Sequence, residues 1–174
     1  MVGENYDARK LASSGRTWKN WSGHQSCRPR DFIRVSGVRE LSEVVAAAGS
    51  AGRQITTVGS GHSFTPTALS NDLLLDISRT AGVISVDRDS GLVEVGAGTI
   101  LADLNRELDH LGLAMPNLGD IDRQTIAGAV STGTHGTGIS LPNISAQIES
   151  LKLMGADGEI RELKAGTDEL LAAR

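Results

Sequence analysis

The chain has 174 residues, a length typical of one domain, and its composition excludes several classes of protein. A net charge of -4 and only two Trp, one Tyr and two Phe argue against nucleic-acid binding, which needs basic stripes or aromatic stacking platforms. The single cysteine, Cys27, excludes an internal disulfide framework and indicates a reducing, cytoplasmic location. No apolar run approaches the roughly 20 residues of a membrane-spanning helix.

Positive charge is concentrated at the N-terminal end of the chain. Residues 1–34 contain seven Lys or Arg and three Asp or Glu, so they carry +4 and the remainder carries -8. This segment could contact an anionic membrane surface, but its charges are scattered and form no amphipathic stripe, which favours a solvated segment. Because residues 1–30 also show no sustained hydrophobic period, we expect an irregular arm there, followed by a domain over 31–174.

The first periodic region predicts a β-α-β unit. Residues 32–35 alternate as a short strand, and Ser36 is placed to cap a helix that ends at Gly49. Residues 54–58 are β-branched and predict a second strand. A strand–helix–strand order implies parallel pairing, so we expect a smaller subdomain with parallel strands over about 31–80.

The rest of the chain predicts a larger subdomain over about 81–174. A strand expected over 73–77 still belongs to the smaller subdomain. The expected elements of the larger one are, in chain order, strands over 83–86 and 92–95, a helix from the capping residue Thr99 to Gly112, a helical turn over 125–130, a hairpin over 148–154 and 159–163, and a helix from Thr167. No repeat with a period of 20–50 residues is present.

Glycine is enriched and is concentrated in candidate binding loops. It makes up 21 of 174 residues, against a usual share of about 7%. The first loop, Gly59-Ser60-Gly61-His62-Ser63, directly follows a predicted strand. Successive small residues expose backbone N–H groups that can wrap an anion, and the two serine hydroxyls are further donors. A tight turn without a ligand is the alternative.

Two further glycine-rich segments are candidate binding loops. Gly96-Ala97-Gly98-Thr99 resembles a dinucleotide fingerprint, but Leu101 replaces its third glycine, which favours a simple turn before a helix. In the third segment, residues 125–136, a helix that starts at Thr125 would offer free N–H groups and a positive dipole end to an anion. Its small side chains would also allow a flat ligand to approach, or alternatively a close helix–helix contact.

Among the histidines, His62 has the most distinctive position. It lies at the end of the first glycine loop, where an imidazole nitrogen can attack an electrophilic carbon of a ligand. We expect His135 to hold its loop by hydrogen bonds and His110 to be solvent-exposed. The sequence has no HxxxH or CxxC spacing, so no metal site is expected, and it has no Gly-x-Ser-x-Gly elbow, which disfavours a hydrolase.

Three segments, in order, resemble the FAD-binding domain of the vanillyl-alcohol oxidase class of flavoproteins. They are residues 58–64 (VGSGHSF), 95–98 (VGAG) and 124–138, which contains QTIAG and TGTHGTG. Within that class the chain is most similar to the sugar 1,4-lactone group, which contains L-gulonolactone oxidases and dehydrogenases and D-arabinono-1,4-lactone oxidases. Residues 18–23 (WKNWSG) resemble the N-terminal segment of that group, and the likeness extends over 18–174.

The resemblance implies an α+β fold of two subdomains that hold FAD between them, a small one built on a parallel βαβ unit and a larger one with a mixed, mostly antiparallel sheet and helices. It implies that the loop over 59–63 wraps the diphosphate. In members with a histidine at this position of the loop, that histidine is linked to the 8α-methyl carbon of the flavin, so His62 is the candidate for covalent attachment. Gly119 stands near a position where an alanine in related dehydrogenases is thought to block oxygen, which favours an oxidase.

The residues that the resemblance assigns to FAD binding are Gly59, Ser60, Gly61, His62, Ser63, Phe64, Asn117, Gly119, Asp120, Thr125, Ile126, Gly128, Ser131, Thr132, Gly133, Thr134 and His135.

The implied activity of the complete enzyme is hydride transfer from a sugar-derived 1,4-lactone to FAD, with oxygen or another electron acceptor. Members of the group are more than twice as long and have a separate cap domain that supplies substrate contacts and catalytic residues. We therefore expect this chain to be part of a longer protein, to lack those residues and to be inactive alone. Alternatives are an alditol (polyol) oxidase of the same class and a non-catalytic nucleotide-binding module. A nicotinamide-binding Rossmann protein is disfavoured.

Overall fold

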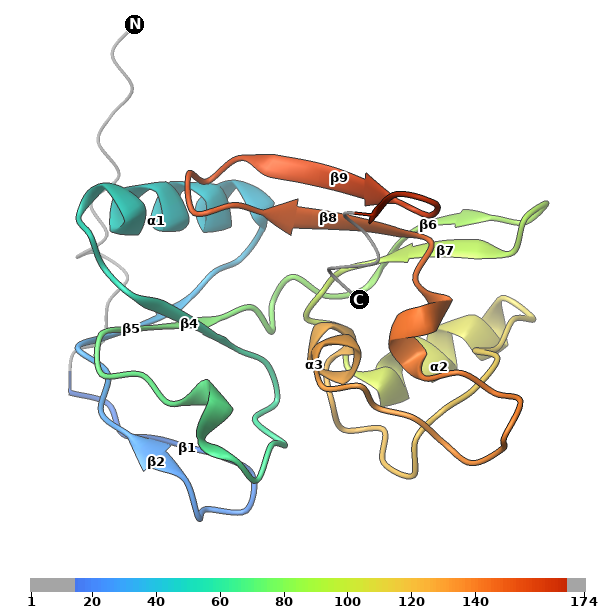
Figure 1. Cartoon of the computed structure of the whole chain (residues 1–174), viewed down its shortest axis with the longest axis horizontal. Helices are drawn as coiled ribbons and strands as arrows, with labels where there is room; N and C mark the ends of the chain where they lie inside the picture. Colours follow the sequence, from blue (N-terminus) through green and yellow to red (C-terminus); the bar gives the residue numbers. More distant parts are fainter. Residues whose placement is uncertain (1–14, 169–174) are drawn as a thin grey trace, which may run out of the picture. The chain divides into compact units, whose positions relative to one another are not determined.

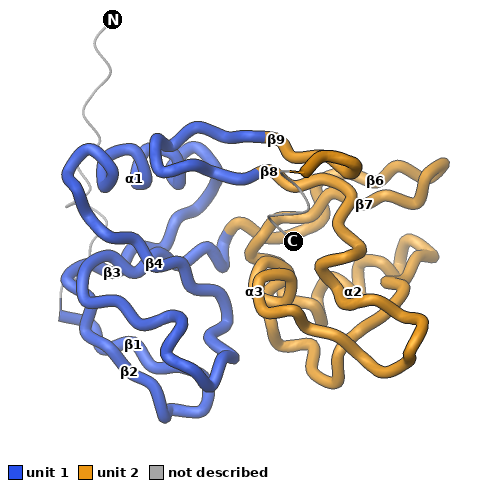
Figure 2. Tube along the Cα trace, in the orientation of Figure 1, with its two compact units in different colours: residues 1–79, 153–161 blue, residues 80–152, 162–174 orange. Residues whose placement is uncertain are grey.

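The computed structural model describes residues 15–168 of the chain, which divides into two units (Figures 1 and 2). The first unit contains residues 1–79 and 153–161, and the second contains 80–152 and 162–174. The segment 153–161 therefore belongs to the first unit, whereas the boundary expected near residue 80 assigns it to the larger subdomain. Each unit is described separately below.

A three-stranded parallel sheet forms the centre of the first unit. Its strand order is β3 (Asp31–Arg34), β5 (Leu73–Asp76) and β4 (Ile55–Val58), and α1 (Val38–Ser50) connects β3 to β4. All four residues of β5 are buried, as expected for a central parallel strand. The prediction of parallel pairing is confirmed, but β3 and β4 do not pair directly, because β5 lies between them.

The N-cap of α1 lies one residue later than predicted. Gly37 occupies the N-cap position, and the N–H and hydroxyl groups of Ser36 both donate to a carboxylate oxygen of Glu40, at 2.7 and 2.6 Å. Ser36 thus ties the incoming chain to the first turn of the helix instead of capping it.

A short hairpin forms within the region expected to be irregular. β1 (Trp18–Lys19) pairs antiparallel with β2 (Ser26–Cys27), and we call residues 18–27 the N-terminal hairpin. The Trp18 and Cys27 side chains pack against Phe32, Val58 and Leu74 of the sheet. The hairpin and α1 lie on opposite sides of this sheet (Figure 1). The expectation of an irregular arm does not hold for these residues, and residues 1–14 lie outside the described part.

One arginine joins the starts of all three strands of the parallel sheet. The guanidinium of Arg53 contacts Asp31 at 2.7 Å and Asp72 at 2.6 Å, and the second carboxylate oxygen of Asp72 accepts the N–H of Gln54 at 2.8 Å. The hydrogen bonds from Arg53 are the main cause that lowers the pKa of Asp72. Arg53 and its two aspartates therefore hold together the N-terminal ends of the three strands. The connections that follow β3 and β4 leave from the opposite ends.

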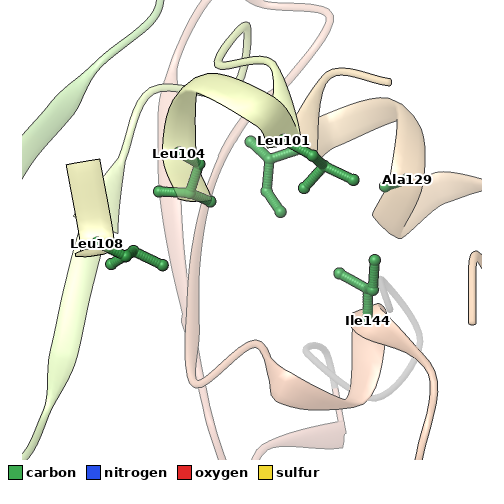
Figure 3. Packing of buried hydrophobic residues seen from close by; sticks show 6 residues of the cluster. Leu101, Leu104, Leu108, Ala129 and Ile144 are labelled. Carbon is green, nitrogen blue, oxygen red and sulfur yellow. The ribbon is translucent and has the colours of Figure 1, made fainter. Parts of the chain in front are cut away.

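The second unit has a helical core beside an antiparallel hairpin. Strands β6 (Val83–Asp87) and β7 (Leu92–Val95) form the hairpin, and β8 (Ser150–Met154) and β9 (Ile160–Lys164) form another two-stranded sheet. The core contains Leu101, Leu104 and Leu108, which lie on one stripe of α2 (Leu101–His110). They pack with Ala129 of α3 (Ile126–Ser131) and Ile144 of the short 3₁₀ helix Ile144–Gln147 (Figure 3).

The predicted elements of this unit are present, with one local difference at the start of α2. Thr99 is buried, its hydroxyl donates to Gly96 O at 2.6 Å and accepts the N–H of Gly82 at 2.9 Å, and Ile100 occupies the N-cap position. Thr99 therefore holds the preceding turn and does not cap the helix. The helix expected from Thr167 extends outside the described residues. The predicted α+β fold, with parallel and antiparallel sheets, is confirmed.

Two loops of the second unit approach so closely that one of them needs a glycine. A Cβ atom at Gly136 would lie 2.0 Å from Leu118 O and 2.6 Å from Asn117 Oδ1. At Gly119 the nearest atom would be Thr134 Cγ2 at 3.0 Å, a methyl group that can move slightly. The carbonyl oxygen of Leu118, which a Cβ atom at Gly136 would meet, is a backbone atom and can move only if its whole loop is displaced.

Replacing Asp72 with Asn should destabilise the protein in a pH-dependent manner. The variant loses charge-assisted hydrogen bonds and is expected to lose about 1–3 kcal/mol of unfolding free energy near neutral pH. The folded-state pKa of Asp72 lies below its unfolded value of 3.8, so this contribution is present above that value and disappears as the pH falls through the folded pKa. Urea unfolding at about pH 7 and about pH 3 measures the difference.

The control for this experiment is Glu43→Gln, which removes the exposed ion pair with Arg39 in α1. It should change the unfolding free energy by less than about 0.5 kcal/mol at either pH. A loss of unfolding free energy in Asp72→Asn that is the same at both pH values would contradict the assignment of this contribution to the ionised Asp72 carboxyl group.

Replacing Gly136 with Ala should cost about 1–3 kcal/mol, because the added methyl group meets backbone. Gly119→Ala is the matched control, and we expect it to cost clearly less, since its methyl group meets a side-chain methyl at 3.0 Å. Thermal unfolding of both variants makes the comparison. A Gly136→Ala protein that unfolds at the temperature of the unsubstituted chain would show that the loops do not approach in this way.

Candidate functional site

The first glycine loop leaves the carboxyl end of a parallel strand. Residues 59–64, here called the His62 loop, directly follow β4, which ends at Val58. Ligands of open parallel sheets commonly bind at such strand ends. Gly61 has a φ of +68°, and a Cβ atom there would lie 2.9 Å from Cζ2 of Trp18. Both observations require glycine at this position of the loop.

The N-terminal hairpin donates three hydrogen bonds to carbonyl groups of the His62 loop. These are Trp21 N–H to Gly61 O at 2.9 Å, Asn20 Nδ2 to Ser63 O at 2.9 Å, and Gln25 Nε2 to Phe64 O at 3.3 Å. Asn20 is 6% exposed, and its Oδ1 accepts the N–H of Gln25 at 3.0 Å. The buried amide thus binds the loop through Nδ2 and the N-terminal hairpin through Oδ1.

The donors of the same loop are left free. Within residues 15–168, the backbone N–H groups of residues 60–63 donate to no acceptor, and neither do the hydroxyls of Ser60 and Ser63. Three of the six carbonyls of the loop are thus paired, whereas successive N–H groups are available, an arrangement suited to bind phosphate oxygens. Diphosphate binding by this loop stays a prediction, with which the available N–H groups are compatible.

His62 lies within a small aromatic cluster. Its imidazole stacks on the indole of Trp21, with ring centroids 5.0 Å apart and an interplanar angle of 19°. Phe64 meets the same indole edge-on at 6.0 Å, and Trp21 and Phe64 are each 65% exposed. An imidazole held in this way is half-buried on the same loop as the free N–H groups.

Other predicted site residues come together in the second unit. Gly119 lies against Thr134 and His135, and the Asn117 side chain lies against Gly136. The amide of Gln124 donates to the hydroxyl of Thr134 at 3.0 Å. Nδ1 of His135 lies 2.9 Å from Gly136 O, so this histidine holds its loop as expected, and His110 is exposed as expected.

The remaining residues of this group differ in exposure. Four of them are exposed on the surface of the second unit: Asp120, Ser131, Thr132 and Gly133. Thr125 and Ile126 are 2% and 7% exposed, and Ile126 belongs to the helical core. The side chains of these two residues therefore serve packing and capping, and only the exposed members can present side-chain atoms to a ligand.

The start of α3 does not offer the free N–H groups that its sequence predicts. The N–H groups of the first three helical residues, 126–128, donate to Thr99 O at 2.7 Å, Ala97 O at 3.1 Å and Thr125 Oγ1 at 3.2 Å. The prediction of an anion site at this helix start is wrong, because the neighbouring turn already uses its donors. That turn is the second glycine segment, so its interpretation as a structural turn is confirmed.

Asn20 and Trp21 are the site residues that reasoning from composition and spacing did not identify. The segment WKNWSG was noted only as part of a family resemblance. The sequence feature that could have identified them is a pair of polar residues between two tryptophans, in a stretch without periodicity. Such a pattern indicates a local structure that is held by side chains.

Two kinds of feature are not found among residues 15–168. No group of three or more His, Cys, Asp or Glu side chains is arranged to hold a metal ion there. No helix in that part of the chain has the length and apolar character needed to cross a membrane.

Comparison with known proteins identifies the family. The model of the family described as "FAD binding domain" matches residues 29–164. An L-gulono-1,4-lactone dehydrogenase of Mycobacterium tuberculosis is 43% identical over 157 residues, which cover 90% of this chain and 36% of the relative. L-gulonolactone oxidase of Mus musculus is 34% identical over 162 residues, which cover 92% of this chain and 37% of the relative. The chain thus spans little more than a third of the length of these relatives.

Solved structures support the fold. Cholesterol oxidase from B. sterolicum matches with a TM-score of 0.79 at 16% identity, over 95% of this chain and 35% of that one. A variant of BBE-like 1 from Physcomitrella patens matches with a TM-score of 0.73 at 23% identity, over 82% of this chain and 31% of that one.

The family match covers well over half of the chain, and the L-gulono-1,4-lactone dehydrogenase of M. tuberculosis is similar over 90% of it. The chain belongs to the FAD-binding domain family of flavoproteins.

Proposed function

We propose that this chain is the FAD-binding part of an oxidoreductase that oxidises a sugar-derived 1,4-lactone. The observation that carries the proposal is the arrangement of donors and acceptors in the His62 loop. The carbonyls of Gly61, Ser63 and Phe64 are paired, while the N–H groups of residues 60–63 have no acceptor within the described part of the chain. The substrate class rests on the similarity to an L-gulono-1,4-lactone dehydrogenase and an L-gulonolactone oxidase.

FAD, when bound, accepts a hydride from a C–H bond of the substrate and passes the electrons to oxygen or another acceptor. The contribution of this chain is to bind and orient the cofactor. Residues 59–64 would hold the diphosphate, and the exposed residues around Asn117, Gly119 and Thr132–His135 are proposed to contact other parts of the cofactor. Substrate contacts and the catalytic residues belong, in this proposal, to sequence that the matched third of the relatives does not contain.

His62 is proposed to carry the flavin covalently. An imidazole nitrogen would form a bond to the 8α carbon and lose its proton, and the carbon would lose a second proton. The electron pair of the broken C–H bond would pass to the isoalloxazine ring and from there to dissolved oxygen, so that atoms and electrons balance. The imidazole lies on the proposed diphosphate loop itself, which would hold it close to the cofactor.

The experiment is a visible spectrum of the purified chain after incubation with FAD, repeated on the protein pellet after acid precipitation. A yellow pellet is expected for the unsubstituted chain, and His62→Ala should bind FAD but release it into the supernatant. Yellow colour that both proteins release into the supernatant would support FAD binding by the chain and overturn the covalent role of His62. Failure of the folded chain to bind FAD would overturn the proposal as a whole.

A second variant tests the loop itself. Ser60→Asp places a negative charge among the free N–H groups and should weaken FAD binding at least tenfold, since an anion then competes with the diphosphate for the same donors. Ser50→Asp, on an exposed residue at the end of α1, adds the same charge elsewhere and should leave the affinity within about twofold. Titration of flavin fluorescence in the His62→Ala background measures both. Equal affinities would contradict diphosphate binding by this loop.

A further inference from the structure

The stacked pair of Trp21 and His62 is not needed to hold the fold. Trp21 is 65% exposed, so its indole is not part of a buried core. Its backbone is nevertheless fixed, because its N–H donates to Gly61 O and the neighbouring Asn20 is buried and bonded to Ser63 O. A large aromatic ring on a fixed backbone is thus kept at the surface against one face of an imidazole.

The stack on Trp21 restricts the orientation of the His62 imidazole. No hydrogen bond to either ring nitrogen of His62 is formed within residues 15–168, so neither nitrogen is held by a polar partner. A histidine side chain without such a partner can occupy three staggered χ1 positions. The near-parallel contact with the indole, at 19° and 5.0 Å, is compatible with only one arrangement of the ring. Phe64, edge-on to the same indole at 6.0 Å, supports the indole from another side.

We propose that Trp21 is a positioning residue, whose indole holds the His62 imidazole in the rotamer from which it bonds to the flavin. This inference rests on the proposed covalent role of His62 and adds a residue to it. The bond and electron balance of the step are those given above, with dissolved oxygen as the final oxidant, and Trp21 takes no part in the bonds. Its role is to raise the fraction of the chain whose imidazole is correctly oriented when FAD binds.

The expected result follows from the rotamer count. In Trp21→Leu the imidazole should distribute among about three positions, so covalent attachment at saturating FAD should be about threefold slower or more. Trp21→Phe keeps a flat ring and should attach flavin at close to the original rate. The rate is measured as flavin absorbance of the acid-precipitated pellet at successive times after FAD is added. Attachment by Trp21→Leu at the original rate would overturn the proposal.

Two further readouts separate positioning from a general structural effect. In the chain without FAD, the indole ring should shift the His62 ring protons upfield in the NMR spectrum, and Trp21→Leu should remove that shift. The signals of His110, exposed on α2, should stay unchanged in a folded variant. A His62 signal that is insensitive to Trp21→Leu would show that the stack is absent in solution and would also overturn the proposal.

The second readout is FAD affinity in the background of His62→Ala. Addition of Trp21→Leu should change this affinity by less than about twofold, because a positioning residue acts only through the imidazole. A loss of fivefold or more would mean that the indole contacts the cofactor itself, which contradicts the proposal. Failure of the proposed function gives a different result, because the unsubstituted chain itself then leaves a colourless pellet. Failure of this inference alone leaves pellets of the unsubstituted chain and of Trp21→Leu that become yellow at the same rate.

Discussion

Burial of β5 between two parallel neighbours is the constraint on which the geometry of the first unit depends. Its residues alternate between the two faces of the sheet. Leu74 faces the N-terminal hairpin, where it packs with Trp18 and Cys27, and its neighbours in the strand face the other way. Because the hairpin is seated on this face, the tryptophan and asparagine that follow Trp18 reach the His62 loop. The loop is thereby shaped by a segment that precedes it by about forty residues.

Much of the fold could be predicted from the sequence, since hydrophobic period and turn residues give the elements. The position of β5 could not, because a β-α-β pattern gives strand direction but does not show which strand lies between the other two. The N-terminal hairpin was missed for a related reason. Its strands have two residues each, too few for any period, and side chains and the sheet beneath them hold it in place.

In the candidate site, too, the local sequence does not show which N–H groups are available. Two segments of small residues, one at Gly59–Ser63 and one at the start of α3, both predict exposed N–H groups. In the first, the backbone N–H of Trp21 and the side chains of Asn20 and Gln25 pair three carbonyls, and the N–H groups of residues 60–63 have no acceptor among residues 15–168. In the second, a nearby turn takes the donors through Thr99 O and Ala97 O. Composition cannot distinguish these outcomes, because the acceptors that decide between them come from other parts of the chain.

The segment 153–161 gives the first unit a discontinuous construction, since it leaves the second unit, touches α1 and returns. Its turn is held there by the hydroxyl of Ser42, which donates to Gly158 O at 2.7 Å, and Gly158 has a φ of +80°. No single stretch of sequence therefore encodes the first unit completely. An exchange of this unit between two flavoproteins by recombination would need crossovers at three places, near residues 79, 153 and 161, and a chain cut once near residue 80 would leave the surface of α1 without its cover.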